Sequence, residues 1–239
     1  MMHELDDPPQ QQHYPMASRY NIIDYESDDE QDDDIRGPSN ENLVSAASFV
    51  TQLLNKEGIN YALMGAFALK CFGSNRDTNN VDIAVDTSMK RLWQIIEPED
   101  RLVIPQSRLV ADVMKIFVKT GPGYDHCRDT KLIEVEMISP EQTLTQYKGS
   151  NGSPRDIGSH QQMLVASGPL GEQVSFKALD VLYLLRSKMD VIAARGAPKD
   201  FLDVQFIIDH WSQELAKIQG YAERIRSDID SMLTPPPSP

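Results

Sequence analysis

The sequence predicts an α/β (α+β) domain in which a small mixed sheet is flanked by helices and followed by a C-terminal helical hairpin. Two observations lead to this prediction. Short apolar runs alternate along the chain with segments whose apolar residues recur at helical spacing. The 239 residues, of which 40% are hydrophobic and 25% charged, are typical of a globular protein with one sizeable core. We expect this domain to span residues 43–230.

Two polar tails are predicted on either side of the domain. Residues 1–40 hold eleven acidic residues against Arg19 and Arg36, so −9 of the net charge of −13 lies there and −4 in the remaining 199 residues. Such a segment is too polar to fold by itself, and we expect a disordered acidic tail. It is either solvated without a specific role or a site for a protein partner. Residues 233–239 are predicted to form a second, Pro-rich disordered tail.

The composition narrows the class of protein. The nearly balanced domain has no electrostatic footprint for extended duplex binding. No apolar run reaches the roughly 18 residues of a membrane helix, and the N-terminus lacks the basic-then-apolar pattern of a signal peptide. The two cysteines, Cys71 and Cys127, are then expected to be free thiols. We expect a cytoplasmic or nuclear protein with no membrane partner.

The elements of the domain follow from periodicity. Apolar residues between Leu43 and Leu54 predict a helix that stops near Gly58, and Pro98 ends a later helix. In chain order after the first helix, the sequence predicts a strand over 60–65, a helix over 66–73, a strand over 81–86, a helix over 88–97, and strands over 101–106, 113–119 and 131–138.

The C-terminal part is predicted to be mainly helical. Residues 139–160 are dense in turn formers and predict a long mobile loop, and residues 173–176 predict a last strand. Two helices complete the predicted hairpin. The first carries Ala178, Leu182, Leu185, Met189 and Ile192 on one face and precedes Gly196 and Pro198, and the second covers 199–217.

The corner between the first strand and the next helix carries residues suited to phosphate. Gly65 follows the strand directly, where a helix begins, so a ligand can approach the backbone closely. The loop after this helix contains Ser74, Arg76 and Thr78. Hydroxyls and a guanidinium group hydrogen bond well to phosphate oxygens, so we expect these residues to bind phosphate.

The next strand adds candidate metal ligands. Asn80 and Asp82 lie on the same face because strand side chains alternate. A carboxylate beside a phosphate site is the usual way in which proteins hold Mg²⁺. The corner is therefore predicted to bind a phosphate-bearing ligand together with a metal ion.

This stretch resembles the minimal nucleotidyltransferases of the DNA polymerase beta-like superfamily, closest to the branch that contains abortive-infection toxins. The resemblance implies a nucleoside triphosphate (NTP) bound with Mg²⁺, or with Mn²⁺ in its place, and transfer of a nucleoside monophosphate to an acceptor that is RNA, a protein or a small molecule. It also implies a third carboxylate on a later strand, for which Glu136 is the match and Glu134 the substitute. The residues that carry the resemblance are Gly65, Ala68, Gly73, Arg76, Thr78, Asn80 and Asp82.

A second block near the C-terminus also resembles the family. It consists of Leu185, Lys188, Ala193, Arg195, Lys199, Asp200 and Asp203. We interpret Arg195, Asp200 and Asp203 as a structural ion-pair cluster that docks the last two helices. For Lys188 both a structural role and a phosphate contact remain open.

Two positions depart from the family pattern, and they leave two functions open. Ala66 stands where a second Gly or Ser belongs, and Asn80 stands where the first metal-binding aspartate belongs. The chain is either a nucleotidyltransferase or a weakened or inactive pseudo-nucleotidyltransferase that acts as a nucleotide- or partner-binding module. The expected catalytic and metal-binding residues are Asp82, Glu136 and Asn80, and the expected nucleotide-binding residues are Gly65, Ser74, Arg76, Thr78 and Lys188.

Overall fold

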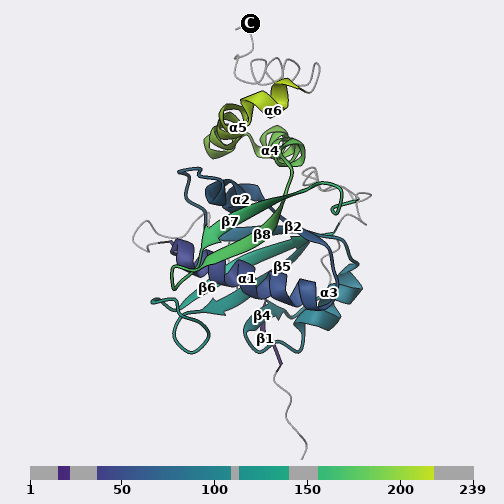
Figure 1. Ribbon diagram of the computed structural model, residues 1–239. Coiled ribbons are helices and arrows are strands. Elements are labelled where there is room, and N and C mark those ends of the chain that lie inside the picture. The colour runs from purple at the N-terminus through teal and green to yellow at the C-terminus, as the bar shows by residue number, and fades with distance from the viewer. Residues whose placement is uncertain (1–15, 22–36, 109–112, 140–155, 218–239) are drawn as a thin grey trace, which may run out of the picture.

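The computed structural model describes residues 16–21, 37–108, 113–139 and 156–217. Within these ranges the structure has an eight-stranded mixed sheet and six helices, of which the last ones lie at one end of the sheet (Figure 1), and this confirms the predicted α/β class. The strands are β1 Ser18–Tyr20, β2 Tyr61–Met64, β3 Asn80–Val85, β4 Leu102–Pro105, β5 Val113–Thr120, β6 Lys131–Ile138, β7 Gln161–Ser167 and β8 Gln173–Leu179. The helices are α1 Asn40–Lys56, α2 Gly65–Cys71, α3 Met89–Ile96, α4 Val181–Arg195, α5 Pro198–His210 and α6 Ser212–Ala216.

The order of the strands brings together residues that are far apart in the sequence. The order is β1-β4-β5-β6-β3-β2-β8-β7, with β3 parallel to β6 and β5 antiparallel to β6. In this register Asp82 lies opposite Glu136, and Lys115 of β5 lies opposite Glu136 on its other side. Three neighbouring strands therefore present charged side chains on one face of the sheet.

The other face of the sheet is the core. Val81 and Ile83 alternate with the polar residues of β3 and are fully buried, as are Ile133 and Val135 of β6. Helix α1 contacts β3, β5 and β6, and Figure 1 shows it crossing the sheet. Ser39 caps this helix by accepting a hydrogen bond from the backbone N–H of Asn42. One face of the central strands thus packs on α1, which leaves the opposite face for a site.

The C-terminal helices lie at one end of the molecule. Helices α4 and α5 form the helical hairpin that the sequence predicts. Helix α4 begins at its cap Asp180 and ends at Gly196, which has a left-handed φ of 60°. Pro198 then starts α5 at the position where a helix best accepts proline. Helices α4 and α5 pack on each other and on α2 (Figure 1), so the hairpin lies next to the corner that follows β2.

Strand β1 lies in the segment for which the sequence predicts disorder. It pairs in parallel with β4, and the Tyr20 ring packs edge-on against Phe117 with centroids 5.1 Å apart. The Tyr20 hydroxyl donates to the backbone oxygen of Lys115 at 3.1 Å, and burial is the main cause that raises the pKa of Tyr20 to about 12. A single well-packed aromatic residue therefore anchors three residues of a segment that is otherwise strongly polar.

The region from residue 156 onward also differs from the prediction. Strand β7 is an edge strand that the sequence did not reveal, and β8 continues to Leu179, so Ala178 belongs to a strand and not to the helical face. The predicted helix over 199–217 is two helices, which meet at Trp211. Residues 140–155 of the predicted loop, and everything after residue 217, lie outside the described ranges.

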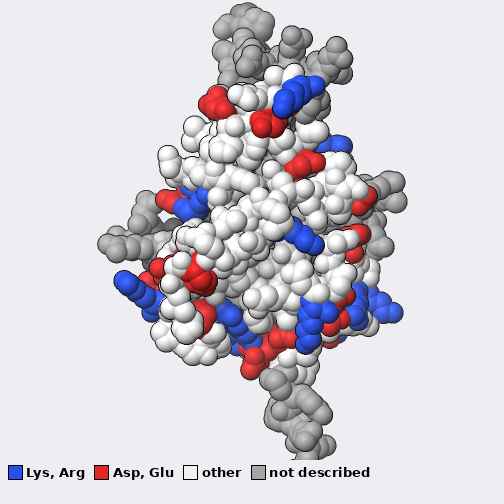
Figure 2. Space-filling model, in the orientation of Figure 1, with Lys and Arg blue, Asp and Glu red and all other residues white. Residues whose placement is uncertain are grey.

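Charged side chains of both signs are mixed on the surface. Figure 2 shows acidic and basic residues interspersed on the face in view, with broad uncharged areas between them. In the part of the chain that the structure describes, no helix is long and apolar enough to cross a membrane.

Candidate active site

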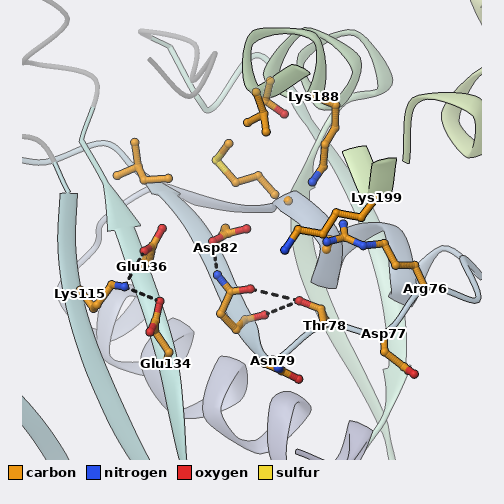
Figure 3. Close-up of a pocket in the computed structure, with 17 residues that line it drawn as sticks. Arg76, Asp77, Thr78, Asn79, Asp82, Lys115, Glu134, Glu136, Lys188 and Lys199 are labelled. Atoms are coloured by element: carbon orange, nitrogen blue, oxygen red, sulfur yellow. Dashed lines mark hydrogen bonds and ion pairs between the residues drawn. The ribbon is translucent and has the colours of Figure 1, made fainter. Parts of the chain in front are cut away.

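A pocket of about 620 Å³ opens on the charged face of the sheet, under α4 and α5. Figure 3 shows its two sides. Asp82, Glu134 and Glu136 rise from β3 and β6, while Lys188 of α4 and Lys199 of α5 point toward them from the helices. The pocket thus places carboxylates opposite ammonium groups.

Gly65 makes room for the central carboxylate. Its φ is +67°, and a Cβ atom there would lie 1.8 Å from Oδ2 of Asp82. Only glycine combines this backbone conformation with such a close approach. The sequence associated Gly65 with a phosphate, and in the structure the group that lies against it is the Asp82 carboxylate.

A chain of hydrogen bonds orients Asp82. The Thr78 hydroxyl donates to Oδ1 of Asn80 at 3.1 Å, and Nδ2 of Asn80 donates to Oδ1 of Asp82 at 3.1 Å. Thr78 is buried and Asn80 half-buried. Asn80 therefore places an N–H donor beside Asp82, where the family pattern would place a second carboxylate.

The two glutamates of β6 share one lysine. Nζ of Lys115 lies 2.9 Å from Oε1 of Glu134 and 3.4 Å from Oε1 of Glu136. Burial, together with the nearby charge of Asp82, raises the pKa of Glu136 to about 7. Burial lowers the pKa of Lys115, but its hydrogen bond and charge interaction with Glu134, with Glu136 adding to them, outweigh this and raise it overall.

A buried aspartate holds two cations of the pocket. Oδ2 of Asp203 accepts from Arg76 and from Nζ of Lys188, the latter at 2.8 Å. The Asp203 side chain is 1% exposed, and among the described residues its Oδ1 has no hydrogen-bond partner. The predicted cluster consisted of Arg195, Asp200 and Asp203, and the Arg195 side chain lies outside the described part. The described partners of Asp203 are Arg76 and Lys188, which line the pocket.

Most of the predicted site residues line this pocket: Gly65, Arg76, Thr78, Asn80, Asp82, Glu136 and Lys188. Ser74 does not line it. Its hydroxyl accepts from the backbone N–H of Arg76 at 3.3 Å, so it shapes the loop that carries the arginine. Lys115 and Lys199 line the pocket and were not predicted as site residues. The sequence alone does not single out Lys115, because its place in the pocket depends on the pairing of β5 with β6.

The donor set fits one Mg²⁺ ion. Mg²⁺ in proteins commonly takes one or two carboxylates and completes its shell with water and substrate phosphates. Asp82 and Glu136, in register on neighbouring strands, are the carboxylates that would hold it. Among the described residues, no group of three or more His, Cys, Asp or Glu side chains is placed to hold a metal ion, so the other ligands would come from substrate and water.

Three solved proteins are among those to which the chain is similar in structure. The first is an antigenic nucleotidyltransferase-like protein from Paracoccidioides brasiliensis, with 19% identity and a TM-score of 0.44 over 82% of this chain and 94% of that chain. The second is a candidate nucleotidyltransferase from H. pylori, with 14% identity and a TM-score of 0.43 over 74% of this chain and 72% of that chain. The third is a candidate nucleotidyltransferase from Thermotoga maritima, with 12% identity and a TM-score of 0.37 over 64% of this chain and 86% of that chain. No protein-family model and no curated protein matches the chain. These likenesses concern the fold alone.

Proposed function

We propose that this protein is a nucleotidyltransferase that binds an NTP with Mg²⁺, or with Mn²⁺, and transfers a nucleoside monophosphate to an acceptor. The observation that carries the proposal is the pocket itself, in which Asp82 and Glu136 face Arg76 and Lys188. Carboxylates suit a hard divalent ion, and guanidinium and ammonium groups suit phosphate oxygens. A triphosphate with its metal ion needs both kinds of group in one place.

Each residue has a role in this proposal. Arg76 and Lys188, held by Asp203, bind the phosphates and offset the charge that builds up during transfer. Asp82 and Glu136 hold the metal ion, which when bound polarises a phosphoryl oxygen as a Lewis acid. Thr78 and Asn80 keep Asp82 oriented.

The reaction is a displacement at the α-phosphorus. An acceptor hydroxyl on RNA, a protein or a small molecule forms the new P–O bond and releases its proton to solvent, while pyrophosphate leaves. Such a transfer needs little covalent chemistry from the protein, because it depends mainly on positioning and electrostatic stabilisation. The pocket residues are suited to both tasks.

Calorimetry with the full chain tests ligand binding. Titration with each of the four NTPs in the presence of Mg²⁺ should show binding, which Asp82→Asn and Arg76→Ala should each weaken at least about tenfold. Arg91→Ala is the matched control, because Arg91 is an exposed arginine paired with Glu57 outside the pocket. If neither wild type nor Asn80→Asp binds any Mg²⁺–NTP, the nucleotide site is wrongly assigned.

The Asn80–Asp82 hydrogen bond favours a second candidate function. An amide that donates to Asp82 contributes no negative charge, which suits a module that binds nucleotide without transferring it. Incubation with α-phosphate-labelled NTPs and candidate acceptors separates the two. Transfer by the wild type supports the enzyme, and transfer by Asn80→Asp alone supports the binding module.

A further inference from the structure

We infer that Lys115 takes the place of one metal ion, so that the pocket holds a single divalent cation, whereas the resemblance to the DNA polymerase beta-like superfamily implies a pair of Mg²⁺ ions. The inference deepens the proposed function and rests on it for the identity of the ligand. It concerns the number of cations that the residues of this chain can accept.

Lys115 lies against both glutamates of β6. Pairing of β5 with β6 places it opposite Glu136, and its ammonium group reaches carboxylate oxygens of both glutamates, at 2.9 and 3.4 Å. At these distances the contacts are charge-assisted hydrogen bonds or close ion pairs. An ammonium group has no lone pair for a metal, so it competes with a cation for Glu134 and Glu136.

Burial makes this arrangement hard to displace. The Glu134 side chain is 10% exposed, and that of Lys115 31%. Removing one partner from a largely buried ion pair leaves an uncompensated charge, which is strongly destabilising. A second metal ion at this place would have to separate Lys115 from two carboxylates.

Asn80 also disfavours a second metal ion. The first metal-binding position of the family pattern holds a neutral amide here, and its N–H donates to Asp82 at 3.1 Å. Hard divalent ions prefer carboxylate oxygen over an amide. The strand thus supplies one anionic ligand where a two-metal site uses two.

The formal charges agree with this count. With a cation bound, which lowers the pKa of Glu136, the three carboxylates Asp82, Glu134 and Glu136 are ionised and stand against one ammonium group, which leaves −2 on the sheet side of the pocket. One divalent cation balances that charge. With aspartate at position 80 and an uncharged residue at position 115, the charge would be −4, which two divalent cations would balance.

Mn²⁺ binding measured by electron paramagnetic resonance tests the inference without any activity assay. Free Mn²⁺ gives a strong signal, so titration of the full chain with MnCl₂ counts bound ions, first with Mn²⁺ alone and then with an NTP analogue that has a methylene group between the α- and β-phosphates. We expect one Mn²⁺ per wild-type chain. The double variant Asn80→Asp/Lys115→Met should bind two, close enough to broaden each other's spectrum.

Lys119→Met is the matched control. Lys119 lies on the same strand outside the pocket, where its Nζ hydrogen bonds to Ser18 and to the backbone oxygen of Asp100, and this variant should still bind one Mn²⁺. Should the double variant not fold, Asn80→Asp/Lys115→Gln replaces it, since the amide keeps a donor for Glu134.

The outcomes separate the inference from the proposed function. A count of zero or two in the wild type, or of one in a folded double variant, would overturn the role of Lys115. If the Mn²⁺ counts are as expected but the analogue and all NTPs fail to bind, the proposed function falls and the single-cation site stands.

Discussion

Gly65 combines two properties that no other residue type supplies together. Its backbone has a left-handed φ of +67°, and the space where a side chain would begin is taken by the Asp82 carboxylate. Gly58 has the same φ, yet a Cβ atom there would meet nothing within 4 Å. The two glycines therefore allow the cost of the conformation to be separated from the cost of the contact.

Gly65→Ala should destabilise the protein more than Gly58→Ala. The left-handed conformation alone costs about 1 kcal/mol for alanine, and the overlap with Asp82 should bring the total for Gly65→Ala to about 2–4 kcal/mol. Urea unfolding of both variants gives the two values. Gly65→Ala should also lose Mn²⁺ binding while Gly58→Ala keeps it. Equal losses of stability would show that Asp82 can move away freely.

The raised pKa of Glu136 predicts a dependence of stability on pH. Burial and Asp82 raise the pKa of this carboxyl from its ordinary value of 4.5 to about 7. The folded state therefore favours the protonated form of Glu136. The contribution of this group to the stability of the fold is greatest below pH 4.5 and falls as the pH rises to 7. The loss should be on the order of 1–3 kcal/mol, because the side chain is 27% exposed and partly screened by solvent.

Glu136→Gln provides the control, since it cannot titrate. Urea unfolding at several pH values should show a decline between pH 4.5 and 7 in the wild type that is reduced in this variant. Mg²⁺ should lower the pKa of Glu136, which side-chain carboxyl NMR can follow. Parallel curves for wild type and variant would contradict the assignment.

Sequence reasoning pointed to several pocket-lining residues that lie close together along the chain. Gly65, Arg76, Asn80 and Asp82 fall within one corner, where the order of residue types already indicates phosphate and metal chemistry. Lys115 could not be found in this way. Its role arises only from the register of β5 against β6, and strand register is a property of the folded sheet.

At the scale of elements, α5 determines how the helical hairpin meets the loop before β3. Asp203 accepts from Arg76 of that loop and from Lys188 of α4, so one carboxylate joins three segments. Buried ion pairs of this kind add little net stability but are costly to break. The hairpin and the cationic side of the pocket should therefore be disrupted together.

Asp203→Asn should lower both stability and nucleotide affinity. Arg76 and Lys188 would lose their counter-charge, which should lower the free energy of unfolding by about 2–4 kcal/mol. This is somewhat less than for a fully buried pair, because the Arg76 side chain is 19% exposed. Nucleotide binding by calorimetry should weaken at least about tenfold. Asp209→Asn, exposed on the same helix and bonded to Gln205, should change neither. Unchanged affinity in Asp203→Asn would contradict a positioning role.

Strand β1 should contribute to stability through one side chain. Tyr20→Phe removes the hydrogen bond to the Lys115 backbone and should cost about 1 kcal/mol. Tyr20→Ala also removes the contact with Phe117 and should cost about 2–3 kcal/mol. Thermal unfolding measures both. Tyr124→Ala, at an exposed tyrosine, should stay within about 0.5 kcal/mol of wild type.

The elements that sequence reasoning missed are at the edges of the sheet. Strand β7 buries only Leu164 and Ala166 and exposes Met163 and Val165, so its pattern is short and weakly apolar. An edge strand is also stabilised from one side only, here by β8. The central strands, buried on at least one face by α1, carry stronger patterns and were predicted with nearly the observed bounds.

At the scale of the whole molecule, the charge is unevenly divided. Residues 1–40 carry most of the net charge of −13, while the rest of the chain is nearly balanced. A strongly acidic segment repels free nucleotides and attracts basic surfaces. We propose it as the site for a basic protein partner.

Neutralising this segment should speed nucleotide binding at low salt. Replacing the eight acidic residues between Asp24 and Asp34 by their amides changes the net charge from −13 to −5. The association rate for Mg²⁺–NTP, measured by stopped flow, should rise several-fold near 10 mM salt, where the Debye length is about 30 Å. In 1 M salt, where that length is about 3 Å, the variant and wild type should agree. A difference that persists there would indicate a direct contact.

The lysine between Glu134 and Glu136 has a consequence for how the protein would respond to its surroundings. A charge that belongs to the polypeptide cannot dissociate, so its local concentration never varies. With a single exchangeable cation, ligand affinity is proportional to the concentration of free Mg²⁺. A tenfold fall in that concentration then weakens ligand binding by about tenfold, whereas a site with two exchangeable ions would lose about a hundredfold. Such a pocket would keep its ligand through swings in free magnesium that would empty a two-ion site.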